Sequence, residues 1–254
     1  MKKKKVLILG GSGFIGFGIV KYLVENRNYD ITIADIFYSN QEDIMFNKYI
    51  SDNKIRMIKG DFTKIKMFDK LENTYDFVYM LASVVGVNRC IEEPHEVIRI
   101  NVSLIQNTLE WIIKNKIRRV LFSSSSECYA ATTDEFDYLI PTPEQVPLTI
   151  ANIAHPRFTY AVTKILGESA FLTYGKKYNF FTTIVRYQNI FGPRMGFKHV
   201  IPHLVERFIK GENPYKIYGG DQTRSFCYIT DAAKGTVLAI ENKNSDQNIF
   251  HIGS

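Results

Sequence analysis

The chain has 254 residues, of which 45% are hydrophobic and 23% are charged, and its formal net charge is +6. This composition is typical of globular proteins, and the length suits one large domain or one domain that carries a small lobe. No apolar run reaches membrane-spanning length, and the basic start at residues 1–5 leads into a short strand-like run. We therefore expect neither a membrane partner nor a signal peptide.

The basic residues and the cysteines limit the partners and the compartment. Lysines and arginines are scattered along the chain, which favours a pocket for an acidic ligand over a nucleic-acid surface. Cys90, Cys128 and Cys227 form no CxxC pair, so we expect reduced cysteines and a cytoplasmic protein. His199 and His203 have no evident third ligand, so we expect no metal site.

Short β-branched runs alternate with longer amphipathic runs. The pattern predicts strands at 6–9, 31–34, 55–58, 77–81, 119–123 and 182–187, and helices over 14–25, 96–114 and 160–178. Such alternation is typical of a parallel sheet with helices on both faces, that is, an α/β fold. Beyond residue 187 the elements shorten and Gly, Pro and aromatics become frequent. We therefore expect a main domain over 1–187 and a substrate-binding lobe over 188–254.

A glycine motif directly follows the first predicted strand. Gly10, Gly13 and Gly16 have GxxGxxG spacing, and an apolar helix that includes Phe14 and Ile15 follows. Glycines there permit a tight turn and a close approach of the backbone to a pyrophosphate, which the helix N-terminus attracts. The motif alone is weak evidence, but its position between strand and helix predicts a doubly wound, Rossmann-type dinucleotide site.

Two acidic residues end the next two strands. Asp35 lies about 20 residues beyond the glycines, where a carboxylate bonds the adenosine ribose and repels a 2′-phosphate, so we expect NAD and not NADP. A solvated strand end is the alternative for Asp35. Asp61 follows the third strand and can accept from the adenine amino group, or it can cap a helix over 63–71.

Tyr160 and Lys164 are four residues apart on a predicted helix and therefore share a face. A phenol has an ordinary pKa of about 10, and a nearby ammonium and a cationic nicotinamide both favour its deprotonated form. Tyr160 is then a candidate base for a substrate hydroxyl, and Lys164 can hold the nicotinamide ribose. YxxxK by itself is common on helices and is weak evidence. The glycine motif and the serine-rich stretch that precede it favour the catalytic interpretation.

Serines 123–126, Glu127, Cys128 and Tyr129 follow one another at the carboxyl end of a strand, where open parallel sheets bind ligands. A serine hydroxyl there can bond the reacting oxygen beside Tyr160. The alternative, serines as turn residues, suits Ser123 and Ser124 better than Ser125.

Taken together, these motifs resemble the extended short-chain dehydrogenase/reductase family of NAD-dependent nucleotide-sugar epimerases, dehydratases and decarboxylases, including the UDP-glucuronate decarboxylases. Two later segments strengthen the resemblance, which covers essentially the whole chain. Residues 186–194 (RYQNIFGPR) resemble the RxxNxxGPR segment that leads to the nucleotide sugar, and residues 219–226 (GGDQTRSF) resemble the loop whose arginine holds the diphosphate. The resemblance implies further lobe elements after Ser254, and the sequence leaves open whether the protein is short or incomplete.

The resemblance assigns roles to individual residues. Ser125, Tyr160 and Lys164 match the catalytic set, and Ser126 and Glu127 fall where relatives differ by reaction. Asn189, Arg224 and Val200 match substrate contacts, as does Ser126. The resemblance and the motifs together place the cofactor against Gly10, Gly13, Phe14, Ile15, Gly16, Asp35, Asp61, Phe62, Leu81, Ala82, Tyr160 and Lys164.

The family chemistry starts by oxidising the sugar at C4 to a ketone, after which the sugar is epimerised, dehydrated or decarboxylated. Glu127 resembles the decarboxylases and some 4,6-dehydratases more than the simple epimerases; its alternative is a loop carboxylate in solvent. We also expect a homodimer through helices 96–114 and 160–178, which carry Trp111, Ile113 and Phe171 beyond one buried stripe. A second functional class is a protein that binds NAD and nucleotide sugar without turnover, as a sensor or scaffold.

Overall fold

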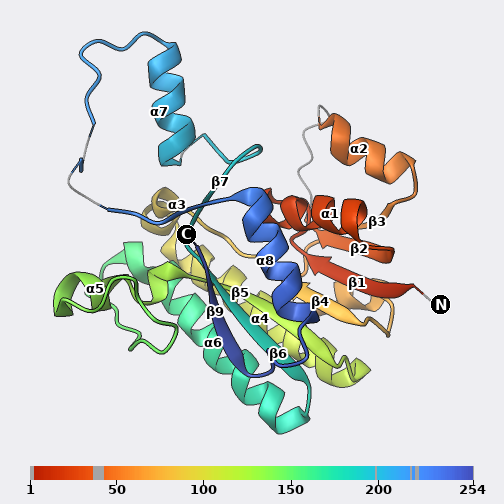
Figure 1. Ribbon diagram of the computed structural model, residues 1–254. Helices are drawn as coiled ribbons and strands as arrows, with labels where there is room; N and C mark the ends of the chain where they lie inside the picture. Colours follow the sequence, from red (N-terminus) through yellow and green to blue (C-terminus); the bar gives the residue numbers. More distant parts are fainter. Residues whose placement is uncertain (1–2, 37–42, 198, 218, 221–222, 254) are drawn as a thin grey trace.

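The computed structural model of the chain describes residues 3–36, 43–197, 199–217, 219–220 and 223–253. Its centre is a seven-stranded parallel sheet in the order β3-β2-β1-β4-β5-β6-β9 (Figure 1). Chain order reverses between β1 and β4, as in doubly wound folds, and this places the ligand crevice at their carboxyl ends. The strands are β1 (Lys4–Leu9), β2 (Tyr29–Asp35), β3 (Ile55–Lys59), β4 (Phe77–Met80), β5 (Arg119–Ser125), β6 (Phe181–Tyr187) and β9 (Asn248–Ile252).

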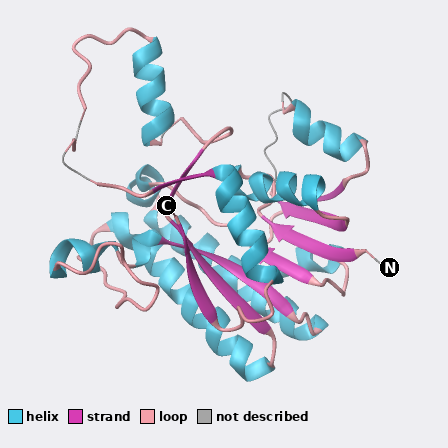
Figure 2. Ribbon diagram, viewed as in Figure 1, coloured by secondary structure: helices cyan, strands magenta, loops and turns pink. Residues whose placement is uncertain are grey.

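Helices cover both faces of this sheet and enclose two apolar layers (Figure 2). One face packs against α1 (Phe14–Asn26), α2 (Ile44–Ser51) and α8 (Ile229–Glu241). The other packs against α4 (Pro94–Asn115), α6 (Thr159–Tyr178) and the short 3₁₀ helix η1 (Ile65–Lys70). The predicted α/β fold is confirmed, and each predicted strand and long helix lies within two residues of its observed bounds.

The long helices begin and end where local chemistry dictates. Pro94 opens α4, where its missing N–H costs nothing and its fixed φ suits the first turn. Lys116 and Asn179 follow α4 and α6 in the left-handed conformation, at φ 54° and 55°, and so end both helices. These residues set the C-terminal ends of α4 and α6, which cover the face of the sheet opposite α1 and α8.

The remaining elements lie above the carboxyl ends of the strands or beside them. They are α3 (Val87–Glu92), η2 (Ser126–Cys128), α5 (Ala130–Phe136), η3 (Pro156–Phe158), β7 (Asn189–Phe191), α7 (Val200–Ile209) and β8 (Phe226–Tyr228). β7 and β8 pair in parallel as a small second sheet, and α7 extends away from the main sheet (Figure 1).

The segment after residue 187 divides into two parts. The sequence assigned all of 188–254 to a lobe, but β9 pairs with β6 as the seventh strand and α8 packs against α1. Residues 229–252 therefore complete the main sheet, because their apolar faces fill its core. A separate substrate-binding lobe stays a prediction, for the part that holds β7, α7 and β8.

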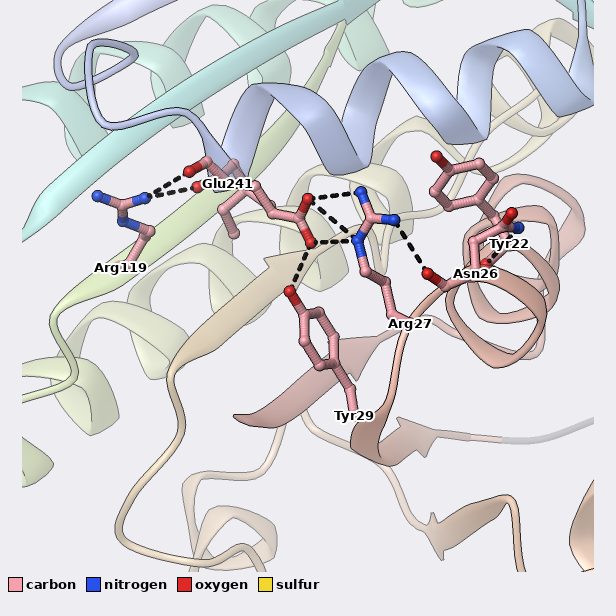
Figure 3. Close-up of polar contacts among 7 residues, drawn as sticks. Tyr22, Asn26, Arg27, Tyr29, Arg119 and Glu241 are labelled. Atoms are coloured by element: carbon pink, nitrogen blue, oxygen red, sulfur yellow. Dashed lines mark hydrogen bonds and ion pairs between the residues drawn. The ribbon is translucent and has the colours of Figure 1, made fainter. Parts of the chain in front are cut away.

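An ion pair joins the C-terminal ends of α8 and α1 near the amino-terminal ends of the strands (Figure 3). Arg27 donates from Nε to Glu241 Oε1 at 3.0 Å and from Nη2 to Oε2 at 2.9 Å, and the Tyr29 hydroxyl donates to Oε1 at 2.7 Å. Arg119 donates to the Ile240 carbonyl oxygen at 3.0 Å. Burial alone raises the pKa of the Glu241 carboxyl, but the bonds from Arg27 and Tyr29 outweigh it and leave the pKa below the ordinary 4.5.

We expect Glu241→Gln to lower the free energy of unfolding by about 1–2 kcal/mol near neutral pH, because the charge-assisted bonds are lost. Since the folded-state pKa of Glu241 is lowered, its stabilisation is present above the unfolded pKa and disappears as pH falls through the folded value. Urea unfolding of both proteins at about pH 7 and about pH 3 measures this: the difference should shrink in acid. An equal difference at both pH values would contradict the assignment.

Candidate active site

The glycine loop between β1 and α1 forms a cradle at the carboxyl end of the sheet. Gly10 has φ +87°, and a Cβ there would lie 2.6 Å from the Ala82 nitrogen. A Cβ on Gly16 would lie 2.1 Å from the Gly10 carbonyl oxygen. α1 starts at Phe14 and Gly13 has no side chain to cap it, which leaves the N–H groups of Phe14 and Ile15 for an anion. The cradle therefore fits the pyrophosphate of a dinucleotide.

Asp35 ends β2 beside this loop. Its Oδ2 accepts a hydrogen bond of 3.0 Å from the Ser12 N–H, in the middle of the glycine motif. Its partly exposed side chain lies at the carboxyl end of the second strand. This is the position from which a carboxylate reaches an adenosine ribose in dinucleotide-binding folds.

The other predicted adenine-side residues differ in what they offer. Asp61 Oδ1 accepts from the Thr63 N–H at 3.0 Å and from the Thr63 hydroxyl, which closes a turn ahead of η1. The N-cap of η1 is Lys64, so Asp61 does not cap the helix that the alternative expected. Phe62 is 4% exposed and its ring meets Phe68 edge-on, so only its backbone is placed to meet a ligand. Leu81 and Ala82 donate their N–H groups to the Leu9 carbonyl oxygen and line the cradle beside Gly10.

Three of the four predicted catalytic residues gather at the carboxyl end of β5. Tyr160 and Lys164 lie on one face of α6, and the Lys164 Nζ is 5.5 Å from the centre of the Tyr160 ring. The same Nζ donates to the Ser123 carbonyl oxygen at 2.8 Å. Ser125 is the last residue of β5, and the proximity of its hydroxyl lowers the pKa of the Tyr160 phenol.

Burial dominates the protonation of this group. It raises the pKa of Tyr160 above its ordinary value, more than the Ser125 bond lowers it. It also lowers the pKa of the Lys164 ammonium to about 8, against an opposing effect of Glu168. Tyr160 is therefore a neutral phenol near pH 7, and Lys164 still carries its charge.

The fourth residue, Glu127, lies in η2 directly after β5. Its N–H donates to the Ser125 Oγ at 3.2 Å, and its carboxylate lies 3.9 Å from the Arg157 guanidinium. Its side chain is 40% exposed. Ser126, between Ser125 and Glu127, is partly exposed.

A buried ion pair that sequence reasoning missed lies directly behind the catalytic residues. Glu168 continues the four-residue spacing of Tyr160 and Lys164 along α6. Arg186 of β6 donates to its two oxygens at 2.8 and 2.7 Å, and both side chains are under 5% exposed. The Ser124 hydroxyl also donates to Glu168. The pair joins α6 and β6, and the Ser124 hydroxyl adds β5. The four-residue spacing of Glu168 from Lys164 was the signal in the sequence that could have placed Glu168 on the same face of α6.

The predicted substrate residues lie on the small second sheet and on α7. Asn189 begins β7 and donates to the Ser225 carbonyl oxygen at 2.8 Å, and Arg224 precedes β8, whose first residue pairs with Asn189. These two predicted contacts are therefore brought together. Val200 begins α7, away from the main sheet, and is 52% exposed. Asp221 and Gln222 of the predicted diphosphate loop, and Lys198, lie outside the described residues.

Two further features bear on partners. Within the described ranges, no helix has both the length and the apolar content to cross a membrane. The same residues hold no group of three or more His, Cys, Asp or Glu side chains placed to bind a metal ion.

Comparison with known proteins agrees with this geometry. Residues 6–253 match the model of the NAD dependent epimerase/dehydratase family. The chain is 33% identical to the UDP-N-acetyl-alpha-D-glucosaminuronate decarboxylase of Bacillus cytotoxicus, over 99% of this chain and 75% of the relative. It is 31% identical to a putative UDP-glucose 4-epimerase of Methanocaldococcus jannaschii, over 96% and 76%.

Solved structures agree on the fold and on the class of ligand that such proteins bind. The UDP-N-acetylglucosamine 4-epimerase of Methanobrevibacter ruminantium M1, in complex with UDP-N-acetylmuramic acid, superposes with a TM-score of 0.82 at 27% identity, over 100% of this chain and 77% of that one. The UDP-glucuronic acid 4-epimerase of Bacillus cereus, in complex with UDP-glucuronic acid and NAD, gives 0.80 at 25%, over 98% and 77%. This chain, with its glycine cradle and its serine, tyrosine and lysine at the end of β5, belongs to the NAD-dependent epimerase/dehydratase family.

Proposed function

We propose that the protein oxidises C4 of a UDP-linked sugar with bound NAD and then changes the resulting 4-keto sugar. The observation that carries this is the meeting of Ser125, Tyr160 and Lys164 at the strand end next to the glycine cradle. A UDP sugar is the substrate class because the relatives above are named for UDP-linked sugars. Bound NAD would lie on Gly10–Gly16 with Asp35 at its ribose, and it would supply the acceptor for the hydride that leaves C4.

In the first step Tyr160 takes the proton of the C4 hydroxyl. The neutral phenol first gives its own proton to solvent water, and the positive charge of Lys164 beside its ring stabilises the phenolate that remains. Ser125, whose hydroxyl lowers the pKa of Tyr160, would hold the C4 oxygen beside the phenol. The same phenol returns a proton to this oxygen when the ketone is reduced again.

In the second step we assign Glu127 to the sugar carbon next to the ketone. A ketone at C4 lets the bond between C5 and a C6 carboxylate break, with the electron pair moving to the C4 oxygen and carbon dioxide leaving. C5 then takes a proton, and Glu127 is placed at the open end of β5 to supply or relay it. The 33% identity to a decarboxylase supports this outcome.

C4 epimerisation is the second candidate. It needs Tyr160 and Lys164 and a rotation of the keto sugar, with no role for Glu127. The 31% identity to a putative 4-epimerase and the superposition on two epimerases favour it. A binding protein without turnover is not favoured, because the relatives are named as enzymes and the predicted catalytic side chains lie together.

The substrate contacts of Ser126, Asn189, Val200 and Arg224 stay predictions, as does the cytoplasmic location. The predicted homodimer also stays a prediction, with one correction. Trp111 and Phe171 are 4% and 0% exposed and belong to the protomer's own core, so they are not free to form a contact.

We expect the dimer contact through the outer faces of α4 and α6, where Ile98 and Leu166 are 44% and 46% exposed. Multi-angle light scattering at micromolar concentration should give twice the chain mass for the native protein and one chain mass for Leu166→Glu, because a buried unpaired carboxylate opposes association. A native protein that stays monomeric would contradict the dimer.

Two variants separate the two chemical steps. Tyr160→Phe should lower turnover of UDP-glucuronate or another accepted UDP sugar by about 10²-fold or more, and leave the NAD dissociation constant within about threefold, because the hydroxyl acts in proton transfer.

Glu127→Gln should keep the first step and block the second, so reduced cofactor and a 4-keto sugar accumulate. Absorbance of the reduced nicotinamide and mass spectrometry of the sugar measure both effects.

Retained turnover in Tyr160→Phe would overturn its assignment as the base. A Glu127→Gln variant with native product and rate would remove Glu127 from the mechanism and favour epimerisation.

A further inference from the structure

Arg194 links the segment after β7 to the opposite side of the molecule. Its Nη2 lies 2.7 Å from the Asp43 Oδ2 and donates to the Ser12 carbonyl oxygen at 3.2 Å. Its guanidinium carbon lies 4.0 Å from the centre of the Phe17 ring, within the range of a cation–π contact. One side chain therefore contacts three segments that are far away in the sequence.

All three partners belong to the dinucleotide end of the sheet. Ser12 lies inside the glycine motif, and its N–H donates a hydrogen bond to Asp35 Oδ2. Phe17 lies in the first turns of α1, and Asp43 caps α2 by accepting from the Phe46 N–H at 3.0 Å. Arg194 itself follows Asn189–Phe191, the strand that leads towards the predicted sugar contacts.

This contact is more demanding than an ordinary surface ion pair. The side chains of Arg194 and Asp43 are 26% and 15% exposed, so both charges have lost much of their water. The planar guanidinium meets a carboxylate, a carbonyl oxygen and a ring face at once, which a lysine ammonium cannot reproduce. Arg194 also has a left-handed backbone, at φ +72°, which is uncommon for a residue with a side chain.

We propose that Arg194 is a positioning residue of the NAD site: it clamps the glycine loop and the start of α2 and so slows the release of bound NAD. The inference rests on the proposed function, in which each cycle ends with NAD in its oxidised form again, so that turnover does not require NAD to dissociate. The clamp also ties cofactor retention to the strand that carries Asn189.

The test measures the release of NAD itself, without turnover. The protein is loaded with NAD and mixed with an excess of a fluorescent NAD analogue, and the displacement rate is followed by stopped flow. Arg194→Met should release NAD about tenfold faster or more, as expected for a lost charge-assisted contact. Arg194→Lys should also release it faster than the native protein, because its ammonium cannot make the three contacts together.

A double-mutant cycle with Asp43 tests whether the two side chains act as one clamp. Asp43→Asn keeps a good cap for α2 but removes the charge. It should speed release, and the double variant should release NAD no faster than Arg194→Met, because Asp43 acts through Arg194. Rates that multiply in the double variant would overturn the paired clamp.

Arg27→Met is the matched control. It removes the other arginine–carboxylate pair that anchors α1, at the far end of the same helix (Figure 3). It should lower thermal stability and leave the NAD release rate unchanged. Native-like release from Arg194→Met, or equal acceleration by Arg27→Met, would overturn the proposal. A native protein that binds no NAD would overturn the proposed function as well, so the two failures are distinguishable.

Discussion

The buried pair of Glu168 and Arg186 is the contact on which the arrangement of the predicted catalytic residues depends. Two charges at 2.7 Å that are almost fully shielded from water must satisfy each other, because either one alone would be costly to bury. Arg186 fixes β6, Ser124 fixes the end of β5, and Glu168 fixes α6. Ser125, Tyr160 and Lys164 extend from these same elements, so their mutual distances follow from a pair that does no chemistry itself.

The two ends of the strands differ in what they carry: one end carries stabilising contacts, and the other carries the candidate site. At the amino-terminal ends of the strands, Arg27 joins the end of α1 to α8 (Figure 3), at the opposite end of α1 from the glycine cradle. The carboxyl edge carries the glycine cradle, the serine end of β5 and the small sheet of β7 and β8. Arg194, which follows β7, contacts Ser12 of the glycine loop and Phe17 of α1, and so links the segment after the small sheet to the cradle.

Much of this was predictable because the signals are local. Strand and helix periodicity gave the core elements, and the glycine spacing with Asp35 gave the cofactor end. The YxxxK spacing predicted that Tyr160 and Lys164 lie side by side, because residues four apart on a helix share a face, and the structure shows this. For Asp61 the sequence left two alternatives open: its carboxylate closes a turn with Thr63 ahead of η1, whose N-cap is Lys64, and its contact with the adenine stays a prediction.

The rest depends on contacts between distant segments, which no local pattern encodes. Arg186 looked like part of a sugar-binding segment, but its guanidinium is directed into the core towards Glu168. The return of β9 to the main sheet depends on pairing with β6, some 60 residues earlier. Phe171 and Trp111 looked like surplus apolar residues on helix faces, and they pack inside because the sheet face they cover is broad.

The central claim is that C4 of the sugar is oxidised before any other bond changes. The most direct measurement uses a UDP sugar with deuterium at C4, mixed with NAD-loaded protein and quenched on the millisecond scale for mass spectrometry of cofactor and sugar. We predict that deuterium passes to the nicotinamide and returns to C4 of the product, while Tyr160→Phe shows no transfer. Product that forms without deuterium ever reaching the cofactor would contradict the account.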